Sequence, residues 1–335
     1  MSEINRPLEI AAFLDQNRWE ESAIQPLDGD FSTRRYARLA KADGRTALLM
    51  DADSDQKTLQ FVAIAKILRK TGLQAPEIYA ASANLGLALL QDFGTRNVGG
   101  LLDAGEEAID FYLRAAEILA HLHRYFDRND AQGLDLPLYT AELFATQAEL
   151  FLDHYFPFAL RREASDEERG NFHAAWLATL RPVEIMPKSL LLRDFMPDNL
   201  MDLPNGELGV LDFQDAGIGP VAYDLASLCE NVRRDGGFGF LPEVVAHYRA
   251  ALTQAGGENV LSQSDLLRAC TLLSAQRHTR IMGIIAQLAL EKRRRDKLAF
   301  LPRIRLHLNT ILKEPYLLPV WEWMESTGVL SIQIP

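Results

Sequence analysis

The chain has 335 residues, of which 48% are hydrophobic and 24% are charged, and its net charge is -11. This balance is typical of a folded globular protein and excludes an extensively disordered chain. The length fits a two-lobed enzyme or two domains better than one small core. Because an acidic surface repels phosphate backbones, nucleic acid is not expected as a partner.

Cysteine usage and hydropathy bear on the compartment. Cys229 and Cys270 lie outside any CxxC pair, so two reduced, buried thiols are expected. The N-terminal residues lack the basic and apolar regions of a signal peptide. The most apolar helical stretch, Ile281–Leu290, is too short to cross a bilayer. We therefore expect a cytoplasmic protein without a membrane partner, and the sequence leaves its oligomeric state open.

The first ninety residues show the pattern of an antiparallel sheet with one inserted helix. A short amphipathic helix is expected at Pro7–Trp19, and the inserted helix at Gln56–Lys70. The expected strands are Ile24–Leu27, Arg34–Leu39, Thr46–Met50, Glu77–Ala81 and Leu87–Gln91. The pair Asp43-Gly44 predicts a hairpin turn, because glycine accepts a positive φ.

Beyond Gly94 the periodicity becomes mainly helical. Long helices are predicted at Glu106–Phe126, Ala141–Tyr155, Asp166–Leu180, Ser262–Glu291 and Leu301–Leu312. The segment Lys188–Asp212 interrupts them with short strands around a polar loop, and Asn205-Gly206 predicts a second hairpin. The predicted fold class is therefore α+β. It would have a small antiparallel β-rich N-lobe at residues 1–95 and a large mainly helical C-lobe at residues 96–335, with a pocket in the cleft between them.

One segment carries the chemistry. In the run RDFMPDN, four residues separate Asp194 from Asn199, and Asp212 follows thirteen residues after Asn199 at the end of an apolar strand. Phosphoryl transfer needs a carboxylate at the acceptor hydroxyl and oxygen ligands that hold Mg²⁺ against the phosphates. An Asp and an Asn at this spacing, followed by a metal-binding Asp, form the catalytic-loop signature of kinases.

Several motifs carry a resemblance that covers most of the chain: RDFMPDNLM, LDFQDA, GPVAYDLASL and AHLHR. With these motifs in this order, the sequence resembles the aminoglycoside phosphotransferase family of the protein-kinase-like superfamily. GDFSTRRYARL, ALLMDA, SAQRHTRIMGIIAQL and LPRIRLHL add a closer similarity to bacterial anomeric sugar kinases that act on N-acetylmuramate and N-acetylglucosamine. The resemblance implies a protein-kinase-like fold, ATP and Mg²⁺ as cofactors, and a small amino sugar phosphorylated at its anomeric hydroxyl.

The resemblance also implies roles for individual residues. Asp194 would be the catalytic carboxylate, and Asn199 and Asp212 would bind magnesium. The loop over the ATP phosphates would contain Gly29, Asp30, Ser32 and Thr33, and the hinge that binds adenine through backbone groups would contain Gln91, Asp92 and Phe93.

Two positions depart from the family pattern. Leu192 stands where the family often has a histidine, and Met50 stands where protein kinases have the strand lysine that contacts the phosphates. The phosphate charge must then be met elsewhere. Arg34 or Arg35 is the candidate, because a guanidinium pairs with phosphate bidentately. If no arginine reaches the cleft, a degenerate or inactive kinase becomes an alternative interpretation.

Other polar residues have a structural and a functional interpretation. Arg277, His278 and Arg280 form either a solvated helix face or a substrate site in which arginine binds a sugar carboxylate. His123 is expected to pack inside the protein, and Asp224 to cap the start of a helix. Two functional alternatives stay open: a kinase of another small alcohol, such as an aminoglycoside, a choline-like or a homoserine-like compound, and a non-catalytic nucleotide-binding protein.

Overall fold

The computed structural model describes residues 6–27, 34–52, 55–230, 232–234, 237–258, 260–291 and 294–332. It forms two compact units. Unit 1 contains Met1–Arg114, Tyr125–Asp135 and Pro197–Ala216, and unit 2 contains Ala115–Arg124, Leu136–Met196 and Gly217–Pro335. The long helix α4 (Ala108–Tyr125) supplies residues to both units. The lobe boundary after residue 95 stays a prediction.

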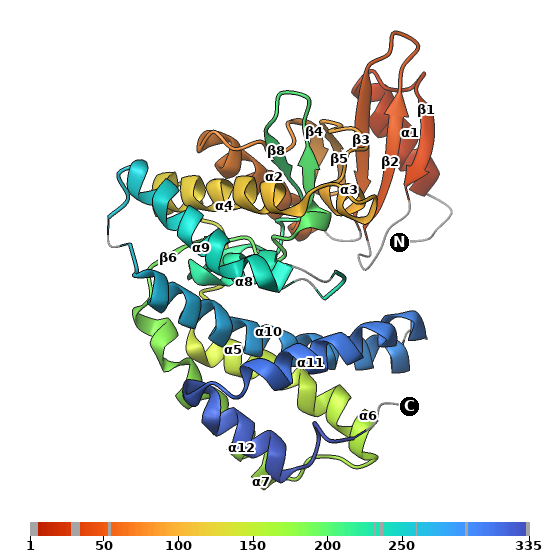
Figure 1. Cartoon of the computed structure of the whole chain (residues 1–335). Coiled ribbons are helices and arrows are strands. Elements are labelled where there is room, and N and C mark those ends of the chain that lie inside the picture. Colours follow the sequence, from red (N-terminus) through yellow and green to blue (C-terminus); the bar gives the residue numbers. More distant parts are fainter. Residues whose placement is uncertain are drawn as a thin grey trace. The chain divides into compact units, whose positions relative to one another are not determined.

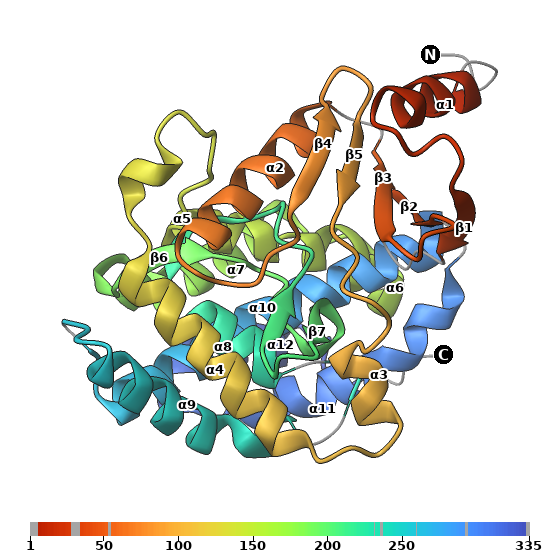
Figure 2. The same ribbon diagram turned by 90° about the horizontal axis from the view of Figure 1, so that it is seen from above.

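Unit 1 is built on a five-stranded antiparallel sheet with strand order β1-β2-β3-β5-β4 (Figure 1). Its strands are β1 (Ala23–Leu27), β2 (Arg35–Ala40), β3 (Thr46–Asp51), β4 (Ile78–Ser82) and β5 (Leu87–Leu90). Helix α2 (Asp55–Lys70) lies beside β4 and β5 when the chain is seen from above (Figure 2). Each strand agrees with its predicted range to within one residue. Gly44 has φ +86°, as the predicted Asp43-Gly44 turn requires.

Strand alternation separates two sets of residues in this sheet. Helix α1 (Arg6–Gln16) buries Phe13 and Leu14 against Leu39 and Leu49, so this face of the sheet is apolar. On the same face, Asp51 at the end of β3 forms ion pairs with Arg6 of α1 and Arg35 of β2. Tyr36 and Met50 alternate with these residues along β2 and β3. They are paired in the register of the two strands and therefore lie together on the opposite face.

Unit 1 also contains the short elements that carry Asn199 and Asp212. Helix α3 (Val98–Asp103) is capped by Asn97, whose side-chain amide also donates to the backbone oxygen of Asp198 over 2.7 Å. The 3₁₀ turn Pro197–Asn199 leads into the hairpin β7 (Leu200–Asp202) and β8 (Leu208–Val210). Gly206 has φ +81°, so the Asn205-Gly206 turn is confirmed.

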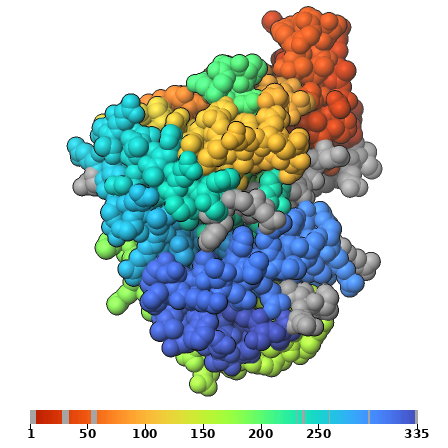
Figure 3. Space-filling model, viewed as in Figure 1, coloured from red at the N-terminus to blue at the C-terminus, as the bar shows by residue number. Residues whose placement is uncertain are grey.

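Unit 2 is mainly helical. Its helices are α5 (Ala141–Ala148), α6 (Phe156–Leu160), α7 (Asp166–Leu180), α8 (Ala222–Cys229), α9 (Gly237–Gln254), α10 (Gln263–Glu291), α11 (Leu301–Ile311) and α12 (Leu318–Ser326). In the space-filling view, the blue surface is formed by unit 2, mainly by helices α10, α11 and α12 (Figure 3). Helix α7 matches its predicted range and begins with a capping box between Ser165 and Glu168.

The predicted helix Ala141–Tyr155 is confirmed as helical, but it is not one continuous α-helix. Helix α5 ends at Ala148, and a π-helical turn follows at Phe151–Tyr155. Helix α10 passes very close to this turn, because a Cβ at Gly283 would lie 2.3 Å from the carbonyl carbon of Leu150. The widened turn and the glycine thus let two helices pack at short range, a tertiary requirement that helical periodicity does not reveal.

A small sheet in unit 2 carries the loop of Asp194. Strand β6 (Lys188–Leu191) pairs with β9 (Gly217–Pro220). Strand β9 was not predicted from the sequence. Within the described part of the chain, no helix is both long and apolar enough to cross a membrane. Cys229 and Cys270 are buried and free, as predicted.

Candidate active site

The two predicted magnesium ligands lie side by side in unit 1. The amide nitrogen Nδ2 of Asn199 is 3.4 Å from Oδ2 of Asp212, and Leu211 donates its backbone N–H to the carbonyl of Asn199 over 2.9 Å. Asp212 has φ +57°, a conformation uncommon outside glycine that often marks functional sites. Gln214 donates to Oδ1 of Asp212 over 2.9 Å, so the carboxylate is oriented from two sides.

This pair fits a magnesium ion chemically. Mg²⁺ binds through one or two carboxylates, further oxygen ligands and the phosphates of its nucleotide. The side chain of Asp212 is 41% exposed and can accept such a ligand. A half-turn of the Asn199 side-chain amide would place its oxygen where the nitrogen stands. The two atoms are assigned only from their hydrogen bonds, so the amide oxygen is available as a metal ligand. Among the described residues no cluster of three or more His, Cys, Asp or Glu could hold a metal, and a magnesium site of this kind needs none.

The two candidate phosphate-binding arginines point to different faces of the sheet. Nη2 of Arg34 is 3.4 Å from Oδ1 of Asp212, and the Arg34 side chain is only 7% exposed. Arg35 is 69% exposed in its side chain and binds Asp51 on the face covered by α1. Geometry therefore favours Arg34 over Arg35 for any role beside Asp212, a predicted magnesium ligand.

The remaining residues of the predicted nucleotide site are partly described. Gly29, Asp30, Ser32 and Thr33 lie outside the described residues.

In the hinge, the Asp92 carboxylate accepts hydrogen bonds from Arg38 over 2.7 and 3.1 Å. Gln91 accepts a hydrogen bond from the backbone of Glu77 over 3.2 Å. The ring of Phe93 lies against Gly209, because a Cβ added at Gly209 would be 2.7 Å from the Phe93 ring. These contacts occupy the side chains of the predicted hinge, so in that prediction the contacts to a nucleotide base fall to the backbone.

Asp194 lies in unit 2, on the loop that follows β6. The backbone of this loop is held by Asp224, which accepts hydrogen bonds from the N–H groups of Leu192 over 2.7 Å and of Arg193 over 2.9 Å. The interpretation of Asp224 as a helix cap is therefore wrong, since α8 has no side-chain cap. Burial raises the pKa of Asp224 to about 7, the two backbone donors oppose this rise, and the charge of Asp194 adds to it.

Positive charge gathers around Asp194 within unit 2. Burial lowers the pKa of Arg280, and the charges of Arg193 and Arg277 lower it further. The charge of Asp194 raises it, so Arg280 lies close enough to Asp194 for the two charges to interact. The guanidinium of Arg193 lies 5.4 Å from the centre of the Tyr139 ring. Arg277 is 4% exposed, and its Nη1 has no hydrogen-bond partner in the described part of the chain.

The solvated-face interpretation of α10 is wrong for Arg277 and His278. His278 is completely buried, with its Nδ1 atom 3.6 Å from the carboxylate of Glu230 and its ring beside that of His307. His278 lies in α10 and His307 in α11, so a substrate could reach His278 only if these two helices moved apart. The structure therefore favours a packing role for His278 over a role in substrate binding. Burial raises the pKa of Glu230 to about 8, and the side chains of Ser274 and Arg277 oppose this rise.

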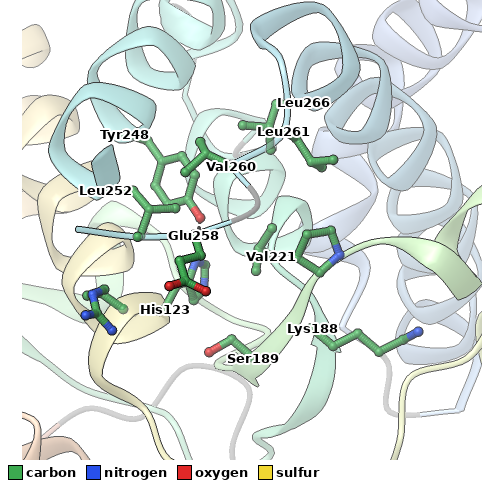
Figure 4. Close-up of a pocket in the computed structure, with 13 residues that line it drawn as sticks. His123, Lys188, Ser189, Val221, Tyr248, Leu252, Glu258, Val260, Leu261 and Leu266 are labelled. Atoms are coloured by element: carbon green, nitrogen blue, oxygen red, sulfur yellow. Dashed lines mark hydrogen bonds between the residues drawn. The ribbon is translucent and has the colours of Figure 1, made fainter. Parts of the chain in front are cut away.

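A separate cavity of about 180 Å³ lies in unit 2, between the end of α9 and strand β6 (Figure 4). His123 and Tyr248 line it and are joined by a hydrogen bond of 2.8 Å, which agrees with the expected packing role of His123. Ser189 and Glu258 also line it. None of the predicted catalytic, metal or substrate residues lies on its wall.

Sequence reasoning missed two residues that contact the candidate site and misjudged a third. Gln214, which orients Asp212, stands two residues further along the same motif. Tyr36 contacts Arg34 and could have been found from the hairpin register. The anchoring role of Asp224 depends on hydrogen bonds from the backbone of Leu192 and Arg193, about thirty residues earlier in the chain, for which the sequence carries no local signal.

Solved structures share this fold. One is the GDP complex of an aminoglycoside 2′-phosphotransferase, with a TM-score of 0.65 and 17% identity, covering 92% of this chain and 99% of that chain. The fold is that of the protein-kinase-like phosphotransferases.

The chain belongs to the phosphotransferase enzyme family, because residues 23–259 match the model of this family. It is 32% identical over 308 residues to the N-acetylmuramate/N-acetylglucosamine kinase of Pseudomonas aeruginosa, covering 90% of this chain and 87% of that protein. It is 29% identical over 309 residues to the protein of the same name from Pseudomonas putida, covering 88% and 86%. The protein is a small-molecule kinase.

Proposed function

We propose that this enzyme transfers the γ-phosphate of ATP, with Mg²⁺, to the anomeric hydroxyl of an amino sugar such as N-acetylmuramate or N-acetylglucosamine. The products are the sugar 1-phosphate, ADP and a proton. The names of the related kinases support the substrate class. The two buried free thiols are compatible with the proposed cytoplasmic location.

The observation that carries the proposal is the contact between Asn199 and Asp212. An amide and a carboxylate at 3.4 Å, with Arg34 on the second carboxylate oxygen, make a site for a metal–phosphate group. Bound by these residues, Mg²⁺ would neutralise charge on the nucleotide phosphates. Asn199 and Asp212 would fix the position of the ion, while the backbone at the hinge would hold the base.

Asp194 has the chemistry of the residue that receives the acceptor hydroxyl. Its carboxylate would orient the anomeric O–H and take up its proton as the bond to phosphorus forms. The two hydrogen bonds to Asp224 support this role, because they hold the backbone on which Asp194 is carried. A general base must keep its position to within a fraction of an ångström, and such anchoring supplies that precision.

The arginines near Asp194 support an acidic acceptor. An unsatisfied buried guanidinium donor is costly, so the free Nη1 of Arg277 points to an anionic ligand or water. Arginine binds carboxylates bidentately, and N-acetylmuramate carries a lactyl carboxylate that N-acetylglucosamine lacks. An aminoglycoside, which is a polycation, would be repelled by Arg277 and Arg280.

A coupled ADP-release assay over amino sugars, amino alcohols and aminoglycosides tests the proposal. We expect turnover with N-acetylmuramate and N-acetylglucosamine, and a product that has lost its reducing end because the anomeric oxygen is phosphorylated. Asp194→Asn should lower kcat by about 10²–10⁴-fold while the affinity for nucleotide is kept. Turnover of an amino alcohol or aminoglycoside alone, or a product that keeps its reducing end, would contradict the proposed substrate.

A further inference from the structure

The position of the missing strand lysine is filled by an apolar side chain. Met50 is completely buried in β3, so it offers no charge to a phosphate. Its register partner across the sheet is Tyr36 of β2, on the face opposite to α1. Whatever replaces the lysine must therefore reach this face of the sheet from another part of the chain.

Arg34, the residue directly before β2, does so. Its Nη1 lies 3.4 Å from the hydroxyl of Tyr36, and its Nη2 lies 3.4 Å from Oδ1 of Asp212. The guanidinium is thus held between the tyrosine that faces Met50 and the carboxylate predicted to bind the metal. Burial raises the pKa of Tyr36, so its phenol stays protonated and can hold the arginine in place.

We propose that Arg34 is the phosphate-binding residue of this kinase, so that the charge of the strand lysine has moved from β3 to the residue directly before β2. Tyr36 acts as its positioning residue. This inference rests on the nucleotide use in the proposed function and adds the residue that contacts the phosphates. The forked guanidinium can bind a phosphate oxygen while keeping its contact with Asp212, which a single ammonium does less well.

Arg35 is the other candidate for the phosphate-binding arginine, and its position argues against that role. It follows Arg34 directly, but its ion pair with Asp51 places it on the α1 face. Arg45 is exposed in the hairpin and pairs with Asp43. It provides a matched control for the loss of one arginine from the same sheet.

The test measures binding of ADP and of adenosine by calorimetry, in the presence of Mg²⁺ and without any sugar. Arg34→Met should weaken ADP binding by about 10- to 100-fold, the effect of losing one charge-assisted contact, and should leave adenosine binding unchanged. Arg45→Met should change neither. Arg34→Met combined with Met50→Lys returns the charge to β3 and should recover at least part of the ADP affinity.

The assignment would be overturned if Arg34→Met kept normal ADP affinity, whether or not Arg35→Met weakened it. It would also be overturned if Arg34→Met weakened adenosine binding as much as ADP binding. If Arg34→Met fails to fold, Arg34→Lys and Arg34→Gln decide. Better ADP binding by the lysine variant supports the proposal, and equal binding overturns it. Because the readout needs no acceptor, it is independent of whether the proposed sugar is correct.

Discussion

The carboxylate of Asp224 binds the backbone of Arg193, the residue before Asp194, over 2.9 Å. Its second oxygen binds the backbone of Leu192 over 2.7 Å. Arg193 has φ +71°, so the loop adopts a conformation that the backbone does not favour by itself. Asp224, from helix α8, stabilises this conformation and thereby sets the position of Asp194.

Replacement of Asp224 by asparagine should lower both stability and kcat. The amide keeps one acceptor but presents a donor to the other backbone N–H, which leaves a buried donor unsatisfied at a cost of about 1–3 kcal/mol. We expect a loss of this size in the free energy of unfolding, measured by urea denaturation, and a fall in kcat with little change in the nucleotide affinity. Asp110→Asn, at a carboxylate whose side chain is 71% exposed, is the control. An unchanged kcat would show that the anchor has no catalytic consequence.

Asp212→Asn should change the magnesium requirement. The substitution keeps size and one oxygen but removes the charge that attracts the ion. We expect the Mg²⁺ concentration at half-maximal rate to rise by about tenfold or more and the maximal rate to fall by about 10²-fold or more. A magnesium titration at saturating ATP measures both. A variant with the magnesium dependence of the original enzyme would mean that the ion is bound elsewhere.

The strands and the hairpins of unit 1 could be predicted because their signals are local. Asp43-Gly44 and Asn205-Gly206 demand positive φ at their glycines, and the apolar alternation beside each turn fixes the register. The division of the helix after Ala148 was not predicted because it depends on Gly283 of α10, more than one hundred residues away. Periodicity reports which face of a helix is apolar, and it carries no information on how closely another helix approaches.

The candidate site shows the same limit. The spacing of Asn199 and Asp212 predicted a metal-binding pair, because a hairpin must bring their strand ends together. The choice between Arg34 and Arg35 required the structure, since neighbouring residues of a strand point to opposite faces and the sequence does not say which face is covered by α1.

Arg280 should discriminate between acidic and neutral acceptors. If Arg280 binds the lactyl carboxylate, Arg280→Met should raise KM for N-acetylmuramate about tenfold more than KM for N-acetylglucosamine, because only the former loses an ion pair. Steady-state kinetics with both sugars provide the comparison. Arg268→Met, at an exposed position of the same helix over the ring of Tyr316, is the matched control. Equal rises for both sugars would assign Arg280 a structural role.

His278 should make the protein sensitive to acid. Burial, followed by the charges of Arg277 and His307, lowers the pKa of His278 to about 3. In the unfolded chain this imidazole has its ordinary pKa of about 6.5. Between these two values the unfolded chain binds a proton that the folded chain does not, so the free energy of unfolding falls as the pH is lowered through this window.

The variant His278→Asn removes this proton uptake. Its free energy of unfolding should therefore depend less steeply on pH between about 6.5 and 3 than that of the original protein, even if its stability at neutral pH is lower because the packing beside Glu230 changes. Urea denaturation at several pH values in this window measures the slope. The same substitution at His247, near the surface beside Glu117, controls for the loss of one imidazole. Identical slopes for the original protein and the His278 variant would mean that His278 takes up its proton in the folded state as readily as in the unfolded chain.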